Sequence, residues 1–263
     1  ANWRSLFRSA FDPQGQQQNQ AITLTRIQVA LASYMESMVF VNTPWREYVQ
    51  GDNRAISNNA KRGAIAFFTP LNEGGLGCAS CHSGDFFTDE QFYNTAFPQI
   101  GRGFRRPENE DIGRWLNTRK ENDKYAFRVP SLLNVELTAP YGHAGTFATL
   151  EEVVKYHVNP VYQVERFDFQ LNHLPQFQPL SVTYPRAKEH TQTALAQDNF
   201  DSAAEKLPRR PLSSHEIEEI TAFLRTLTDH CAASPTCRDA WIPAPKEDPD
   251  GNMLVRDFNP GPK

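Results

Sequence analysis

The chain has 263 residues, of which 39% are hydrophobic, so it can bury a sizeable core as one large domain or two small ones. Its net charge of −4 argues against nucleic acid as a partner. Charged residues interrupt the longest apolar runs, so we expect no membrane span. The first twenty residues lack the basic and apolar regions of a signal peptide, and we expect none in the printed sequence.

Two helices are predicted in the first quarter of the chain. In "AITLTRIQVALASYMESMVF" (21–40) apolar residues recur at helical spacing, and Thr23 or Thr25 can cap the helix. A second helix is predicted in "SNNAKRGAIAFF" from Ser57, and it leads into the Gly-rich segment "NEGGLG". Residues 101–125 are polar and charged, and we expect them to be irregular.

A third helix is predicted in "TLEEVVKYHVNP". Thr149 and Glu152 have the spacing of a capping box, and Pro160 ends the helix. One face of this helix contains the residues at helical spacing, namely Leu150, Val153, Val154 and His157. We therefore expect His157 to point toward the apolar core.

The last predicted helix, "LSSHEIEEITAFLRTLTD", also begins with a capping box, made by Ser213 and Glu216. Its expected buried stripe consists of Ile217, Ile220, Leu224 and Leu227. Before it, residues 161–207 are rich in Gln, Pro and Phe without clear periodicity, and we expect a long loop insertion there. Strand patterns are few, so the sequence predicts a mostly α fold with long irregular loops.

Cys78, Cys81 and His82 form the pattern C-x-x-C-H. A structural zinc site usually takes a second ligand pair at short spacing, which the sequence lacks. A thioredoxin-like pair needs no histidine and follows a strand, whereas the segment before Cys78 is Gly-rich and helical. Covalent haem attachment uses every residue of the pattern, because the thiols bond the haem vinyl groups and the histidine becomes the proximal iron ligand. We therefore predict one covalently bound haem c.

A six-coordinate iron needs a second ligand on its other face, for which Met is the usual choice. However, Met35 and Met38 lie on a helix with core-like spacing, and Met253 lies in the Pro-rich tail. Among the histidines, His157 is favoured because it extends the apolar face of a capped helix. Such a residue is either a satisfied core histidine or a ligand, and a haem in the same core favours the ligand.

The remaining cysteines, Cys231 and Cys237, bracket a short polar segment that contains a proline. A small-loop disulfide is predicted, which implies an oxidising compartment. The alternative is a pair of inert free thiols.

Several of these segments, in their order, resemble the bacterial dihaem cytochrome c peroxidase and MauG family. The motifs are "AKRGAIAFF…GCASCHSGDFFTD", "DIGR" at 111–114, "FRVPSLLNVELTAPYGHAGTFATLEEVVKYH", "LSSHEIEEITAFLRTLTD" and "CAASPTCRDAWIP". The resemblance runs from about residue 20 to 242. It implies a cytochrome c-like haem domain, the C-terminal electron-transfer domain of the family. The peroxide-reactive haem domain of the family would lie on another chain or on a missing part.

This resemblance implies three parts of the chain. Residues 1–50 would be an N-terminal segment with a helix left from the preceding domain of the family. Residues 51–242 would form the cytochrome c-like haem domain, including the insertion at 161–207. Residues 243–263 would be an extended Pro-rich tail.

The resemblance also implies roles for individual residues. The second axial ligand of the family, Met in the peroxidases and Tyr in MauG, falls on His157, with His143 as the runner-up. Thr138 and Pro140 match residues whose backbone carbonyls bind a calcium ion between domains, and the alternative is an ordinary Pro turn. Arg128 matches an arginine near the haem that can pair with a propionate, and the alternative is a surface arginine.

Three functions remain open at this point. The first is an electron-transfer domain that relays electrons to or from a second redox centre on a partner or missing domain. The assembly would then be a peroxidase or MauG-like oxidase, and a peroxidase only if that second haem completes it. The second is a haem peroxidase or oxidase in its own right, with His157 or His143 as acid–base residue. The third is a zinc module that uses Cys78, Cys81, His82 and His157.

Two bound histidines favour the first function. They saturate the iron with strong donors, and imidazole lowers the reduction potential relative to thioether sulfur. Because haem c is attached outside the cytoplasmic membrane, we expect the chain to be periplasmic or surface-exposed.

Overall fold

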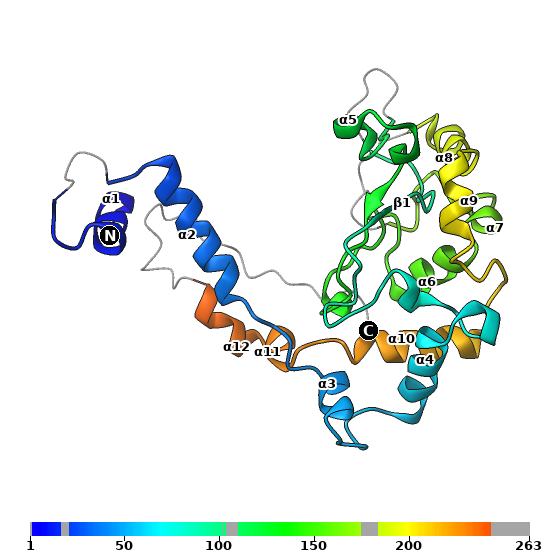
Figure 1. Ribbon diagram of the computed structural model, residues 1–263, viewed down its shortest axis with the longest axis horizontal. Helices are drawn as coiled ribbons and strands as arrows, with labels where there is room; N and C mark the ends of the chain where they lie inside the picture. The colour runs from blue at the N-terminus through cyan, green and yellow to red at the C-terminus, as the bar shows by residue number, and fades with distance from the viewer. Residues whose placement is uncertain (1, 17–20, 102, 104–109, 175–183, 243–263) are drawn as a thin grey trace. The chain divides into compact units, whose positions relative to one another are not determined.

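The computed structural model in Figure 1 describes residues 2–16, 21–101, 103, 110–174 and 184–242. The chain separates into two compact units, one formed by Thr43–Thr228 and the other by Ala1–Asn42 with Asp229–Lys263. Within the described ranges, none of the helices has the length and apolar character needed to span a bilayer. The predicted tail at 243–263, including Met253, lies outside the described residues.

Helices dominate the larger unit, which confirms the predicted mostly α fold (Figure 1). Its α-helices are α3 (Pro44–Val49), α4 (Asn58–Phe68), α5 (Trp115–Thr118), α6 (Leu150–Val158), α7 (Pro160–Val164), α8 (Ala187–Leu195), α9 (Asp198–Ala204) and α10 (Ser214–Arg225). Its short 3-10 turns are η1 (Leu71–Glu73), η2 (Cys78–Ser80), η3 (Glu121–Asp123) and η4 (Val135–Leu137). One small antiparallel sheet joins β1 (Phe92–Tyr93) to β2 (Phe127–Arg128).

The core of this unit forms where α4 packs along α10 (Figure 1). The helices approach so closely at Gly63 that a Cβ there would overlap the Glu219 carbonyl oxygen. The predicted stripe of α10 is buried, and Phe67 of α4 packs against Phe223 with ring centroids 5.0 Å apart. This contact fixes the end of α4, from which the chain enters the Cys-containing turn.

The helix α6 begins as predicted, because Thr149 and Glu152 form a complete capping box. Its C-terminal half is anchored by Tyr156, which is buried and whose hydroxyl donates to the Ala96 carbonyl. On the solvent side, Arg225 of α10 pairs with Glu151 at 2.7 Å. These contacts orient the helix that carries His157.

The predicted long loop at 161–207 is wrong for the described part of that segment, which contains α7, α8 and α9. The helix α7 starts at Pro160, where Asn159 supplies the N-cap. The buried face of α8 consists of small or polar residues, namely Ala187, His190, Thr191 and Ala194. Such a face gives no hydrophobic periodicity, so the sequence pattern did not reveal the helix.

The smaller unit contains α1 (Trp3–Phe11), α2 (Leu24–Ser37), α11 (His230–Ala233), α12 (Pro235–Arg238) and the turn η6 (Asp239–Trp241). Thr23 caps α2 as predicted. The spacing of its apolar residues is typical of a core-facing helix, but α2 contains no buried residue, and Met35 is 67% exposed. Cys231 lies on α11 and Cys237 on α12, and a disulfide bond joins them, with Cα atoms 5.2 Å apart.

Candidate haem-binding site

A tight turn brings the residues of the C-x-x-C-H pattern together. Gly77 enters it with φ +64°, a left-handed conformation that favours glycine, and a Cβ there would lie 3.0 Å from Leu71 Cγ. The backbone N–H groups of Cys81 and His82 both donate to the Cys78 carbonyl, at 3.2 and 2.9 Å. The turn therefore presents two thiols and one imidazole from five consecutive residues, as covalent haem attachment requires.

The ring of His82 is oriented by its own backbone neighbourhood. Its Nδ1 lies 3.1 Å from the Phe87 carbonyl oxygen, which only accepts hydrogen bonds, so Nδ1 carries the proton. The other nitrogen, Nε2, then keeps its lone pair for a metal. Burial lowers the pKa of His82, which keeps the imidazole neutral at neutral pH.

His157 lies opposite this turn on α6. The protein around its ring lowers the pKa of His157 to about 4, because burial disfavours the charged form and His82 repels it. The ring also packs against Phe97, with centroids 5.7 Å apart. His157 is therefore a neutral imidazole, the form that binds metals.

The two imidazole rings have the separation that a shared iron would need. Their centroids lie 6.2 Å apart. Two metal–nitrogen bonds of about 2 Å each would account for most of this separation, and the half-widths of the two rings would account for the rest. The separation therefore leaves room for one metal ion between the rings, so the residues present fit a haem iron.

His143, the alternative iron ligand of the sequence analysis, contacts other residues. Its Nε2 lies 2.9 Å from Asp111 Oδ2, and its ring stacks on Phe127 with centroids 3.6 Å apart. Burial raises the pKa of Asp111, but hydrogen bonds from His143 and the Gly113 N–H outweigh it and leave that pKa lowered. Both partners belong to segments singled out in the sequence, yet their pairing was not foreseen.

The other predicted site residues lie on the surface of the larger unit. Arg128 forms an ion pair with Glu90 at 3.6 Å. Thr138 is exposed, and its hydroxyl donates to the Val135 carbonyl at 3.0 Å. Pro140 is exposed as well. The propionate and calcium roles of these residues stay predictions.

The two thiols do not resemble those of a reactive redox pair. Burial raises the pKa of Cys78 to about 12, and it raises the pKa of Cys81 as well. Without a bound metal both side chains are therefore neutral thiols, whereas disulfide exchange uses the thiolate. Among the described residues, no group of three or more His, Cys, Asp and Glu side chains is arranged to hold a metal ion. The zinc alternative thus finds no support.

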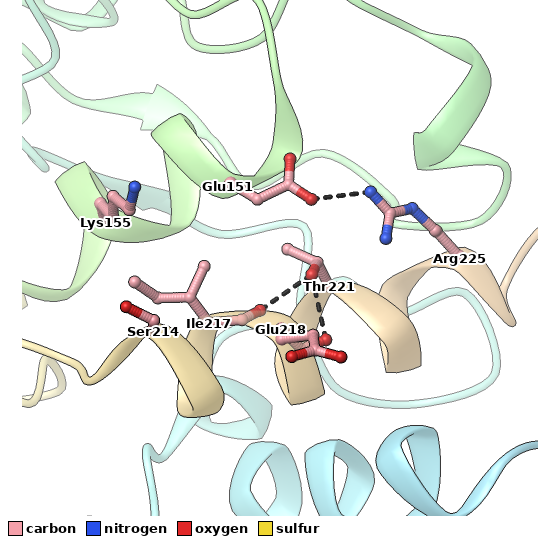
Figure 2. A pocket seen from close by; sticks show the side chains of 7 residues that line it. All are labelled: Glu151, Lys155, Ser214, Ile217, Glu218, Thr221 and Arg225. Atoms are coloured by element: carbon pink, nitrogen blue, oxygen red, sulfur yellow. Dashed lines mark hydrogen bonds and ion pairs between the residues drawn. The ribbon is translucent and has the colours of Figure 1, made fainter. Parts of the chain in front are cut away.

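A recess of about 240 Å³ lies between α6 and α10, and Figure 2 shows the side chains that line it. Glu151 and Arg225 pair across it, and the Thr221 hydroxyl donates to the Ile217 carbonyl at 2.8 Å. Neither His82 nor His157 lines this recess. The recess therefore lies at the contact between two helices and is not part of the candidate haem site.

The sequence of this chain is similar to those of several known proteins, although a scan against models of protein families finds no match. The chain is 32% identical over 181 residues to the methylamine utilization protein MauG of Methylophilus methylotrophus, covering 66% of this chain and 48% of that protein. It is 31% identical over 159 residues to the cytochrome-c peroxidase IdrP1 of Denitromonas iodatirespirans, covering 51% of this chain and 41% of the relative.

Solved structures show the same fold. A MauG-like protein associated with microbial copper homeostasis aligns with a TM-score of 0.59 and 25% identity, covering 90% of this chain and 62% of that one. The diheme peroxidase BthA of Burkholderia thailandensis aligns with a TM-score of 0.58 and 20% identity, covering 86% of this chain and 56% of that one.

The chain belongs to the MauG and dihaem cytochrome c peroxidase family. This confirms the resemblance seen in the sequence, and the cytochrome c-like fold is confirmed with it. Membership supports a c-type haem and a haem redox role. The chain spans less than half the length of the MauG and IdrP1 relatives, so their whole activities are not transferred to it.

The sequence did not reveal the residues that support the two histidines. Phe87 supplies the carbonyl that orients His82, and Phe97 packs on His157. Neither has a pattern that separates it from the other phenylalanines of the chain. Their roles depend on tertiary contacts, which periodicity does not encode.

Proposed function

We propose that this chain is a c-type haem electron-transfer domain of the MauG and dihaem cytochrome c peroxidase family. Cys78 and Cys81 would hold one haem covalently, and His82 and His157 would bind its iron on opposite faces. The observation that carries the proposal is the 6.2 Å separation of the two neutral imidazole rings. When bound, the haem supplies a one-electron couple, and the protein supplies its ligands and surroundings.

The residues of the chain would keep such a haem from reacting with peroxide. His82 and His157 would both hold the iron, and two strong nitrogen donors would leave no position for an incoming molecule. His143, the other candidate acid–base residue, pairs with Asp111 at 2.9 Å, so its imidazole is held by that carboxylate. These features support electron transfer over a peroxidase or oxidase that acts on its own.

The second redox centre would belong to a missing domain or to a partner protein. The relative BthA is a diheme peroxidase, and this chain covers 56% of it. We propose that this chain works beside a second haem, with which the assembly would act as a peroxidase or oxidase. Arg128 remains the candidate propionate contact, and the Thr138 and Pro140 carbonyls remain the candidate calcium ligands between domains.

The compartment follows from the proposed cofactor. Haem c attachment and a Cys231–Cys237 disulfide both imply an oxidising environment. We propose a periplasmic or surface-exposed location, consistent with the helices of the described residues, none of which can span a membrane.

Turnover with hydrogen peroxide separates the two haem functions. We expect the purified holoprotein to be reduced and reoxidised reversibly by one electron and to show no peroxidase turnover with a chromogenic donor. Sustained turnover by the chain alone would instead support an enzyme in its own right. The absence of any haem absorption band would contradict both.

A further inference from the structure

Three polar side chains form a hydrogen-bonded chain in the larger unit. The Tyr93 hydroxyl donates to Asp89 Oδ2 at 2.8 Å, and Lys206 Nζ donates to the Tyr93 hydroxyl at 2.8 Å. The Lys206 ammonium also lies over the Tyr93 ring, 4.3 Å from its centroid. Tyr93 belongs to β1 and Lys206 follows α9, so the fold brings together residues far apart in the sequence.

This cluster lies directly against Cys81. The Asp89 N–H donates to the Cys81 carbonyl at 2.8 Å, and the Tyr93 hydroxyl lies close enough to the Cys81 thiol to influence its pKa. Lys206 and Asp89 act on that thiol with charges of opposite sign. Since Cys81 is a proposed attachment point, one positive and one negative charge would lie beside the edge of the haem.

The charge states of the cluster are fixed at neutral pH. Burial lowers the pKa of Lys206, but the hydrogen bond to Tyr93 and the charges around it outweigh this and leave that pKa raised. Burial raises the pKa of Tyr93, so its hydroxyl stays neutral. Lys206 is therefore a cation, and the neutral phenol holds it at a constant distance from Asp89.

Such charges act on a haem in a defined direction. The ferric haem has one more positive charge than the ferrous haem. A nearby cation therefore disfavours the ferric state and raises the reduction potential, whereas an anion lowers it.

We propose that Lys206 and Asp89, joined through the Tyr93 hydroxyl, set the reduction potential of the haem at Cys81, with Lys206 raising it and Asp89 lowering it. This rests on the proposed function, because it requires the haem to be attached there. The two side chains are positioning and tuning residues for electron transfer, and neither touches the iron.

The test is a spectroelectrochemical titration of the holoprotein at pH 7 and low ionic strength. Lys206→Met should lower the potential and Asp89→Asn should raise it, each changing the equilibrium constant for reduction on the order of 10-fold, the size expected for one unit charge acting through a partly solvated protein. Lys206→Arg should keep the wild-type potential. Lys188→Met is the matched control, since Lys188 pairs with Glu165 at 2.8 Å and should shift nothing.

Shifts of the same sign in both variants, or no shift in either, with the wild-type spectrum retained, would overturn the proposal. If Lys206→Met does not fold, Asp89→Asn alone tests the predicted sign, because it keeps the size of the side chain. A wild-type holoprotein without two nitrogen ligands would contradict the proposed function instead, and the spectrum distinguishes that failure from an unshifted potential.

Discussion

His143 Nε2 lies 2.9 Å from Asp111 Oδ2, and this contact ties the loop before α6 to the "DIGR" segment. His143 is an exposed residue and Asp111 is partly buried, with side-chain exposed fractions of 31% and 23%. The ring of His143 also stacks on Phe127, next to β2 residue Arg128. His143, which the sequence predicted as the alternative iron ligand, therefore connects three segments of the larger unit.

Replacing His143 with Ala should destabilise the protein by about 1.5 kcal/mol, the lower end of the range for a hydrogen bond to a charged group, because the contact is exposed. The haem spectrum should stay unchanged. Urea unfolding at pH 7 measures the first effect and the visible spectrum the second. A change of haem spin state in this variant would mean that the iron ligand comes from this loop.

The contribution of Asp111 should depend on pH. Its pKa is lower in the folded protein than its ordinary value of 3.8, so its stabilising effect is present above that value and is lost as the pH falls through the folded pKa. The stability difference between wild type and Asp111→Asn should shrink as the pH falls below about 4. A difference that stays constant or grows below about pH 4 would contradict this assignment.

The capping box of α10 should also show in acid titration. The hydrogen bond to Arg210 is the largest influence on Glu216, burial opposes it, and bonds from Ser213 add to it, so that the pKa falls from 4.5 to about 2. The stabilisation from Glu216 should therefore be complete above about pH 5 and disappear toward pH 2. Glu216→Gln should flatten the pH dependence of the unfolding midpoint over this interval, and an unchanged curve would contradict the assignment.

Gly63→Ala should separate α4 from α10. A Cβ at this position overlaps the Glu219 backbone, which cannot move without displacing the helix. We expect a loss of about 3 kcal/mol or more, because overpacking outweighs the better helix propensity of Ala. Thermal unfolding of wild type and variant measures this loss of stability. Ile65→Ala on the same helix is the control, since Ile65 is 66% exposed and should change stability little.

Cys78→Ser and Cys81→Ser should each remove one thioether bond, and the double variant should release the haem. Extraction with acidified acetone should leave the haem on the wild-type protein and remove it from the double variant. Haem that is extracted from the wild type would contradict covalent attachment.

The parts of the fold that the sequence predicted were those with local signals. Thr149 with Glu152 and Ser213 with Glu216 marked the starts of two helices, and the stripe of α10 marked its buried face. The structure brings His82 and His157 together, because the C-x-x-C-H pattern is local and His157 lies on a capped helix, and their roles as iron ligands stay predictions.

The missed features depend on contacts between distant segments. The helix α8 has a buried face of Ala, His and Thr residues that no hydrophobic pattern marks, so it was expected to be a loop. The pairing of Asp111 with His143 and the approach of Gly63 to Glu219 appear only when the chain is folded. Periodicity reports which face is apolar and not which residue lies opposite it.

The ligation of the iron by His82 and His157 is the central claim, and the spectrum of the ferric His157→Ala holoprotein tests it most directly. The wild type should be low-spin in the visible and electron paramagnetic resonance spectra. The variant should be high-spin and bind cyanide, and added imidazole should restore the low-spin form, because the empty position accepts an external ligand. A His157→Ala protein that stays low-spin, while His143→Ala becomes high-spin, would contradict the account.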